Sequence, residues 1–193
     1  MYRVYLRTFG CRANQYDSEA VRALVETAGG VVVERAEDAT VAVFNSCAVT
    51  AAAEADLRRS IRHASRVNTT LKTVVMGCAA ARDAGAIAAL PSVEHVVAGA
   101  DLPAIAGALG IAPQDALRVP PRQTATRALL RIQDGCDEHC TFCATTLARG
   151  ANRSRPVSDL LREAAALAER HPEIVLTGIH IGTYGEDVGT TLG

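Results

Sequence analysis

The sequence predicts an open α/β domain with a mainly parallel sheet, followed by the start of a (β/α) barrel. Three observations lead to this prediction. Over residues 1–111, short runs rich in valine alternate with helical patterns, as in parallel strands joined by crossover helices. Prolines and polar residues at 112–126 then indicate a linker. Residues 127–193 contain a strand, a loop, a helix and a second strand, which is the order of a first barrel repeat.

Five strands and four helices are expected in the first unit. The strands are short runs of valine and other strand formers, at Arg3–Thr8, Val31–Glu34, Val41–Asn45, Lys72–Met76 and Glu94–Val97. The helices are expected between them, at Ser18–Ala28, Ala51–Arg66, Asp83–Leu90 and Leu102–Leu109. Gly29 and Gly30 would end the first helix, and Thr50 is a suitable N-cap for the second.

The second unit supplies only the beginning of a barrel. Its expected elements are a strand, a helix and another strand, at Ala128–Gln133, Ser158–Arg170 and Ile174–Thr177. A complete eight-repeat barrel takes roughly 250 residues, and even a partial barrel needs more than two strands. We therefore expect the chain to be an N-terminal fragment or a truncated product, with little or no turnover by itself.

Composition excludes several classes of protein. The chain is 49% hydrophobic with a net charge of −1, so it lacks the overall basic character of many nucleic-acid-binding proteins. No apolar run reaches the ~18 residues of a membrane span, and Met1–Arg7 is too short and charged for a secretion signal. The absence of such signals, together with cysteines of the cluster-binding type, indicates a reducing cytoplasm and no membrane partner. A local basic cluster, interpreted as a solvated helix face, comprises Arg58, Arg59, Arg62, His63 and Arg66.

A compact cysteine motif is the strongest functional signal. Cys136, Cys140 and Cys143 are spaced C-x3-C-x2-C, and three such thiolates can bind three irons of a 4Fe–4S cube. The fourth iron is then free to bind another molecule. This spacing, with Phe142 before the last cysteine, resembles that of radical S-adenosylmethionine (SAM) enzymes. The resemblance implies that SAM binds the open iron and is cleaved by an electron from the cluster.

Two other interpretations of this motif are weaker. A structural zinc site needs four ligands, and only His139 lies close to the three cysteines. A disulfide framework suits short secreted chains, whereas this chain has six cysteines in 193 residues.

The other three cysteines share a setting although they are far apart in sequence. Cys11, Cys47 and Cys78 each follow a predicted strand. In a parallel sheet these positions meet at the carboxyl edge, where α/β folds bind ligands. Gly10 and Gly77 would permit tight turns and close approach of a bulky group. Three thiolates there could hold a second cluster, although free cysteine is also a common small buried residue.

Motifs along the chain resemble those of the methylthiotransferase family. They are Thr8–Glu19, Asn45–Thr50, Gly77-Cys78, Gln133–Cys143, Ala148–Gly150, Arg153–Pro156 and Glu173–Gly178. Within the family, Asn14-Gln15-Tyr16 and Cys47–Thr50 are most similar to the branch that modifies N6-threonylcarbamoyladenosine (t6A) in tRNA. The alternatives are the branches that modify isopentenyladenosine in tRNA or an aspartate of a ribosomal protein.

The resemblance implies two 4Fe–4S clusters with different roles. Cys136, Cys140 and Cys143 would hold the cluster that cleaves SAM, and these residues would be catalytic. Cys11, Cys47 and Cys78 would hold an auxiliary cluster that carries the sulfur to be inserted. The enzyme would add sulfur and methyl at C2 of t6A in a tRNA anticodon loop, with the methyl group from a second SAM and electrons from an external donor. Two other function classes stay open, a non-catalytic iron–sulfur electron carrier and a zinc-stabilised binding module.

Further residues are weaker candidates. Asn14, Asp17 and Glu19 could shape the auxiliary site, or simply favour a helix N-terminus. The loop arginines Arg149 and Arg153 could meet the SAM carboxylate or RNA phosphate, or be ordinary exposed residues. His180 and Tyr184 follow a strand and could face SAM or only pack.

Overall fold

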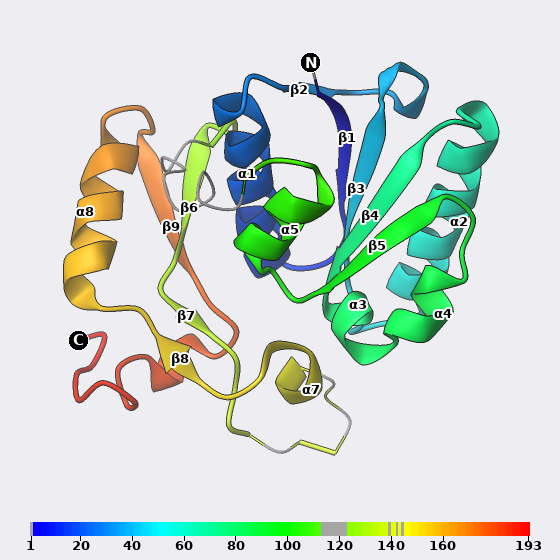
Figure 1. Ribbon diagram of the computed structural model, residues 1–193. Coiled ribbons are helices and arrows are strands. Elements are labelled where there is room, and N and C mark those ends of the chain that lie inside the picture. Colours follow the sequence, from blue (N-terminus) through cyan, green and yellow to red (C-terminus); the bar gives the residue numbers. More distant parts are fainter. Residues whose placement is uncertain (1, 113–122, 139, 142, 144) are drawn as a thin grey trace.

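The first half of the chain forms a five-stranded parallel sheet (Figure 1). The computed structural model describes residues 2–112, 123–138, 140, 141, 143 and 145–193. The strand order is β2-β1-β3-β4-β5, and every neighbouring pair is parallel. The strands are β1 (Arg3–Thr8), β2 (Val31–Val33), β3 (Val41–Ser46), β4 (Lys72–Gly77) and β5 (Val93–Ala98). The predicted α/β class and all five strands are confirmed.

Helices cover both faces of this sheet. α1 (Arg12–Thr27) and α5 (Leu102–Ala108) lie on one face, and α2 (Ala51–Val67) and α4 (Ala84–Ala88) lie on the other. The alternation within β3 shows why both faces are apolar: Val43 packs under α1 and α5, and Phe44 packs under α2. Thr50 caps α2 as expected, since its hydroxyl accepts a hydrogen bond from the Ala53 amide.

Helix α1 begins six residues earlier than expected. The apolar periodicity starts near Ser18, but the helix starts at Arg12, directly after Cys11. Its first turns carry polar side chains, among them Asn14 and Asp17, and both are buried. These side chains face the carboxyl edge of the sheet rather than the apolar core. A short helix that was not predicted, α3 (Cys78–Arg82), starts at Cys78.

The second unit is a single β–α–β repeat with a short insertion. β6 (Arg127–Arg131) and β9 (Glu173–Thr177) pair in parallel, and α8 (Val157–Ala168) packs on them through Leu160 and Leu167. The expected strand Ala128–Gln133 is divided in two: β7 (Gln133–Asp134) leaves β6 and pairs antiparallel with β8 (Arg153–Ser154). The described residues also form α7 (Thr145–Arg149) and two 3-10 turns, Ala36–Asp38 and Ile181–Thr183. One repeat is compatible with a barrel start, which stays a prediction.

Two further expectations concern the linker and membrane-spanning segments. Most of the expected linker at 112–126, namely 113–122, lies outside the described residues. Across the described part of the chain, no helix combines the length and apolar character that crossing a membrane requires.

Candidate functional site

Cys11, Cys47 and Cys78 lie at the carboxyl ends of three adjacent strands. They follow β1, β3 and β4, which are neighbours in the sheet. The chain leaves β1 for β2 on one side and then returns to β3 on the other, so the strand order reverses between β1 and β3. Ligands of open α/β sheets bind at such a reversal. Cys47 and Cys78 are buried and Cys11 is exposed, so the group opens towards solvent at Cys11.

Two glycines allow the chain to pass close to these cysteines. Gly10 and Gly77 have φ angles of +94° and +95°, which side-chain-bearing residues rarely adopt. A Cβ atom at Gly10 would stand 2.7 Å from the sulfur of Cys47, and one at Gly77 would overlap the backbone of Ser46. The expected tight turns at both glycines are confirmed, and close approach of a bulky group stays a prediction.

Replacing Gly10 by alanine therefore tests this crowding. Gly10→Ala is expected to lower the free energy of unfolding by about 1–3 kcal/mol, because it combines backbone strain with a clash against Cys47. Gly29→Ala is the matched control: Gly29 also has a positive φ, of +76°, but nothing lies within 4 Å of its added Cβ. Urea unfolding of both anaerobic variants measures the difference. Equal losses would show that contact with Cys47 adds nothing.

Asn14 links the chain segments that carry the three cysteines. Its Nδ2 donates hydrogen bonds to the carbonyl oxygens of Phe9 (2.8 Å) and Ser46 (2.9 Å). Its Oδ1 lies 3.8 Å from the sulfur of Cys11 and 3.9 Å from that of Cys78. Asn14 is fully buried, so these contacts are shielded from water. These contacts are compatible with the expectation that Asn14 shapes an auxiliary site, which stays a prediction.

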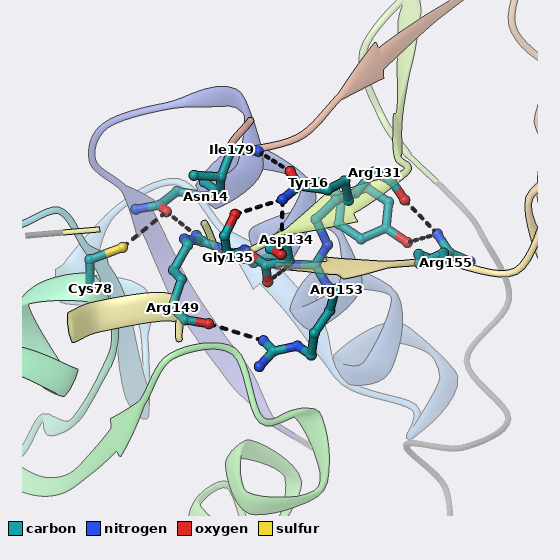
Figure 2. A network of polar contacts seen from close by, with 12 residues as sticks. Asn14, Tyr16, Cys78, Arg131, Asp134, Gly135, Arg149, Arg153, Arg155 and Ile179 are labelled. Carbon is teal, nitrogen blue, oxygen red and sulfur yellow. Dashed lines mark hydrogen bonds and ion pairs between the residues drawn. The ribbon is translucent and has the colours of Figure 1, made fainter. Parts of the chain in front are cut away.

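Arg149 reaches the same site from the other unit of the chain (Figure 2). Its guanidinium donates to Oδ1 of Asn14, to Asp17 at 3.0 Å and to Asp134 at 3.0 Å. The arginine side chain is only 4% exposed. Burial acts to lower the pKa of Arg149, but Asp17, Asp134 and Cys78 outweigh burial and raise it, so the group stays charged. The expectation of a loop arginine free to meet SAM or RNA phosphate is wrong for Arg149.

The charge on Arg149 also influences a thiol of the site. Burial raises the pKa of Cys78, and the nearby Arg149 guanidinium opposes this rise. Helix α7, which ends at Arg149, packs against α3, which begins at Cys78. Ala148 of α7 is part of the same apolar cluster as Cys78 and Ala79. The segment after the compact cysteine motif is therefore docked directly on the first unit.

The described cysteines of the compact motif differ in exposure, and Cys136 lies near the end of β9. Cys140 and Cys143 are exposed, and Cys136 is half-buried, with its sulfur 3.9 Å from Nδ1 of His180. Hydrogen bonding from Thr145, through its side chain and its backbone amide, lowers the pKa of Cys143. His139 and Phe142, both used in the sequence argument, lie outside the described residues. The strand-end position places His180 beside this motif, whereas Tyr184 packs against α8 and donates to the Arg155 carbonyl.

Gln133 is a structural residue that the sequence argument missed. Its Oε1 accepts hydrogen bonds from the amides of Ile179 and His180, both at 2.9 Å. Its Nε2 donates to the Gly135 carbonyl and to Oδ1 of Asn152, both at 2.6 Å. Gln133 is fully buried and ties the start of the cysteine loop to the end of β9. The sequence signal for it is its position at the start of the motif Gln133–Cys143.

A second polar cluster fastens α1 to α8. The Tyr16 hydroxyl donates to Glu163 at 3.0 Å and accepts from Arg155 at 3.2 Å. Burial and the Glu163 carboxylate raise the pKa of Tyr16 to about 12. Glu19 bonds the end of the expected linker, because its carboxylate accepts a hydrogen bond from the Thr124 amide. Arg153 is exposed and donates to the Arg149 carbonyl.

The residues present fit an iron–sulfur cluster better than a single metal ion. Among the described residues, no three or more His, Cys, Asp or Glu side chains are placed to share one ion. A cubane cluster binds each cysteine at a different iron, so its ligands need not converge on one point. The edge at Cys11, Cys47 and Cys78 offers three thiols and two glycines without Cβ atoms. Among described atoms, Nε of Arg149 is buried and has no hydrogen-bond partner, which leaves a donor for a bound group.

Comparison with known proteins identifies the family. The profile described as Uncharacterized protein family UPF0004 matches residues 3–99, about half of the chain. A threonylcarbamoyladenosine tRNA methylthiotransferase of Bacillus subtilis is 36% identical over 97% of this chain and 46% of its own length. The chain belongs to the methylthiotransferase family. Cys11, Cys47 and Cys78 all fall within the profile match.

Two other relatives carry the names of two different kinds of tRNA-modifying enzyme. A threonylcarbamoyladenosine tRNA methylthiotransferase of Thermotoga maritima is 34% identical over all of this chain and 47% of its own length. A tRNA-2-methylthio-N(6)-dimethylallyladenosine synthase of Thermodesulfovibrio yellowstonii is 30% identical over 94% of this chain and 46% of its own. The chain thus spans about half the length of these curated relatives.

Proposed function

We propose that the protein containing this chain is a tRNA methylthiotransferase that adds sulfur and methyl at C2 of t6A. The main supporting observation is the placement of Cys11, Cys47 and Cys78 at one edge of the sheet, joined through Asn14 and Arg149 to the compact cysteine motif. The t6A branch is supported by the Asn14-Gln15-Tyr16 motif and by the names of the B. subtilis and T. maritima relatives. The isopentenyladenosine branch is the alternative, because similar relatives carry dimethylallyladenosine names.

Two sets of residues would hold the cofactors. Cys136, Cys140 and Cys143 would hold one 4Fe–4S cluster, and Cys11, Cys47 and Cys78 would hold the other. When bound, the clusters supply reductive cleavage of SAM at one site and a sulfur atom at the other. We also propose that an external donor supplies the electrons and that the protein works in a reducing cytoplasm. We also propose that residues 127–193 begin a radical SAM barrel, which needs further strands to complete a substrate pocket.

The protein's own residues would position these groups. Gln133 and Gly135 fix the compact cysteine loop against β9, and a Cβ atom at Gly135 would overlap the Ala151 carbonyl. Asn14 holds the segments of the auxiliary site in register. The ion pairs of Arg149 hold the two cysteine sites in a fixed relation, which favours correct alignment of reacting atoms.

The proposal is tested by an assay on two forms of the protein. One is the 193-residue chain, and the other is a chimera in which this chain replaces the matching half of the B. subtilis relative. Each is reconstituted anaerobically and given SAM, dithionite and tRNA carrying either t6A or isopentenyladenosine, and the nucleosides are analysed by mass spectrometry. We expect methylthiolated t6A from the chimera, little from the isolated chain, and none from a Cys136→Ala chimera.

Other outcomes of this assay would contradict the proposal in distinct ways. Product from isopentenyladenosine alone would assign the other branch. SAM cleavage without methylthiolated product from either tRNA would remove tRNA as the substrate. A chimera with loaded clusters that does not cleave SAM would refute the enzymatic proposal and favour an electron carrier.

A further inference from the structure

The position of Arg149 suggests a role beyond joining two units. It lies at the end of α7, on the segment that follows the compact cysteine motif, yet its guanidinium is buried at the other cysteine site. There it donates to Oδ1 of Asn14, the atom that also lies within 4 Å of the sulfurs of Cys11 and Cys78. Figure 2 shows this chain of contacts from Arg149 through Asn14 to Cys78.

The hydrogen-bonding of Arg149 is incomplete. Its two terminal nitrogens are occupied by Asn14, Asp17 and Asp134. Its Nε is buried and has no partner among the described atoms. A buried donor without a partner costs about 1–3 kcal/mol, so such donors are rare unless a ligand completes them. Nε is thus an unpaired donor of a guanidinium whose other end bonds Oδ1 of Asn14, the atom that lies within 4 Å of the sulfurs of Cys11 and Cys78.

The surrounding charges show that the ion pairs alone do not require Arg149 to be an arginine. Asp17 and Asp134 are also bonded by Arg131, at 2.5 Å and 3.2 Å. Two arginines therefore balance two carboxylates, and a lysine at 149 would preserve this balance. What a lysine could not reproduce is the fixed planar fork that contacts Asn14 and both carboxylates while its Nε donor points elsewhere. That geometry is specific to a guanidinium.

We propose that Arg149 is a positioning residue of the auxiliary site, whose guanidinium donates a hydrogen bond to the sulfur-bearing group held by Cys11, Cys47 and Cys78. This inference rests on the proposed function. Hydrogen bonds to the sulfurs of a cluster stabilise its more negative, reduced form and so raise its reduction potential. Because Arg149 belongs to the segment after Cys143, the auxiliary site is complete only when the compact cysteine loop is docked.

The reduction potential of the auxiliary cluster measures this hydrogen bond. The parent protein is a Cys136→Ala/Cys140→Ala/Cys143→Ala variant of the 193-residue chain, in which only Cys11, Cys47 and Cys78 can hold a cluster. Arg149→Lys is added to it, and Arg153→Lys, at an exposed arginine, is the matched control. After anaerobic reconstitution, each midpoint potential is determined by dye-mediated titration followed by electron paramagnetic resonance. The thermal transition of each apo-protein is recorded in parallel.

We expect Arg149→Lys to shift the midpoint potential to a more negative value, with no shift in Arg153→Lys. Loss of the cluster from Arg149→Lys with an apo-protein transition like that of Arg153→Lys would also support the inference. An unchanged potential would overturn it, as would cluster loss accompanied by a matching fall in apo-protein stability, since Arg149 would then act only through the fold. If the parent itself binds no iron, the proposed function fails at this site and the inference falls with it.

Discussion

Arg149→Met is expected to lower the free energy of unfolding by about 3–5 kcal/mol, because it leaves the two carboxylates of a buried network with one arginine instead of two. Asp17, whose side chain is 2% exposed, would lose one of its two arginines, and Asp134 would lose its 3.0 Å contact. The methionine fills much of the volume of the arginine stem, so the loss reports charge and hydrogen bonding rather than a cavity. Urea unfolding of the anaerobic apo-protein, followed by circular dichroism, measures the change.

Arg153→Met is the control for this prediction. Arg153 is four residues along the same segment, is exposed, and makes only a hydrogen bond to the Arg149 carbonyl among the described residues. Its replacement is expected to change stability by less than about 0.5 kcal/mol. If the two variants lost the same stability, the buried network between the two cysteine sites would have no energetic importance.

Gln133→Leu is expected to release the compact cysteine loop from β9. The leucine has a similar size but leaves the half-buried amides of Ile179 and His180 without their acceptor, at a cost of up to about 1–3 kcal/mol for each unsatisfied group. In a Cys11→Ala/Cys47→Ala/Cys78→Ala background, we expect Gln133→Leu to lose most of the iron bound after reconstitution. Iron per chain, measured colorimetrically, is the readout.

Gln123→Leu is the matched control for the loop. Gln123 also bonds a backbone, donating to the carbonyl of Leu129 and accepting from its amide, but it lies away from the cysteines. It should lower stability without lowering iron content. Equal iron in the Gln133→Leu and Gln123→Leu proteins would mean that Gln133 does not position the cysteine loop.

The strands were predictable because their signal is local. Valine-rich runs flanked by glycine and polar residues specify buried parallel strands, and the strand ends then place Cys11, Cys47 and Cys78 together. The topology of a parallel sheet thus converts three distant cysteines into one site. The helical start at Arg12 was missed because Asn14 and Asp17 are polar, and their burial depends on partners far along the chain.

The contact between the two cysteine sites was not predictable from sequence. α3 and α7 each have five residues and too few apolar positions to show a period, so neither gave a signal. The burial of Arg149 depends on α7 docking against α3, which is a tertiary contact between segments about 70 residues apart. An arginine beside an exposed loop is ordinarily solvated, and only the paired carboxylates of Asp17 and Asp134 make its burial favourable.

The central claim is that the chain holds two independent three-cysteine cluster sites. Iron and acid-labile sulfide per chain, after anaerobic reconstitution, test it in three proteins: the unaltered chain and variants with either cysteine set replaced by alanine. We predict about eight irons in the unaltered chain and about four in each triple variant. About four irons in the unaltered chain, all lost when Cys136, Cys140 and Cys143 are replaced, would show that Cys11, Cys47 and Cys78 hold no cluster. That result would contradict the account.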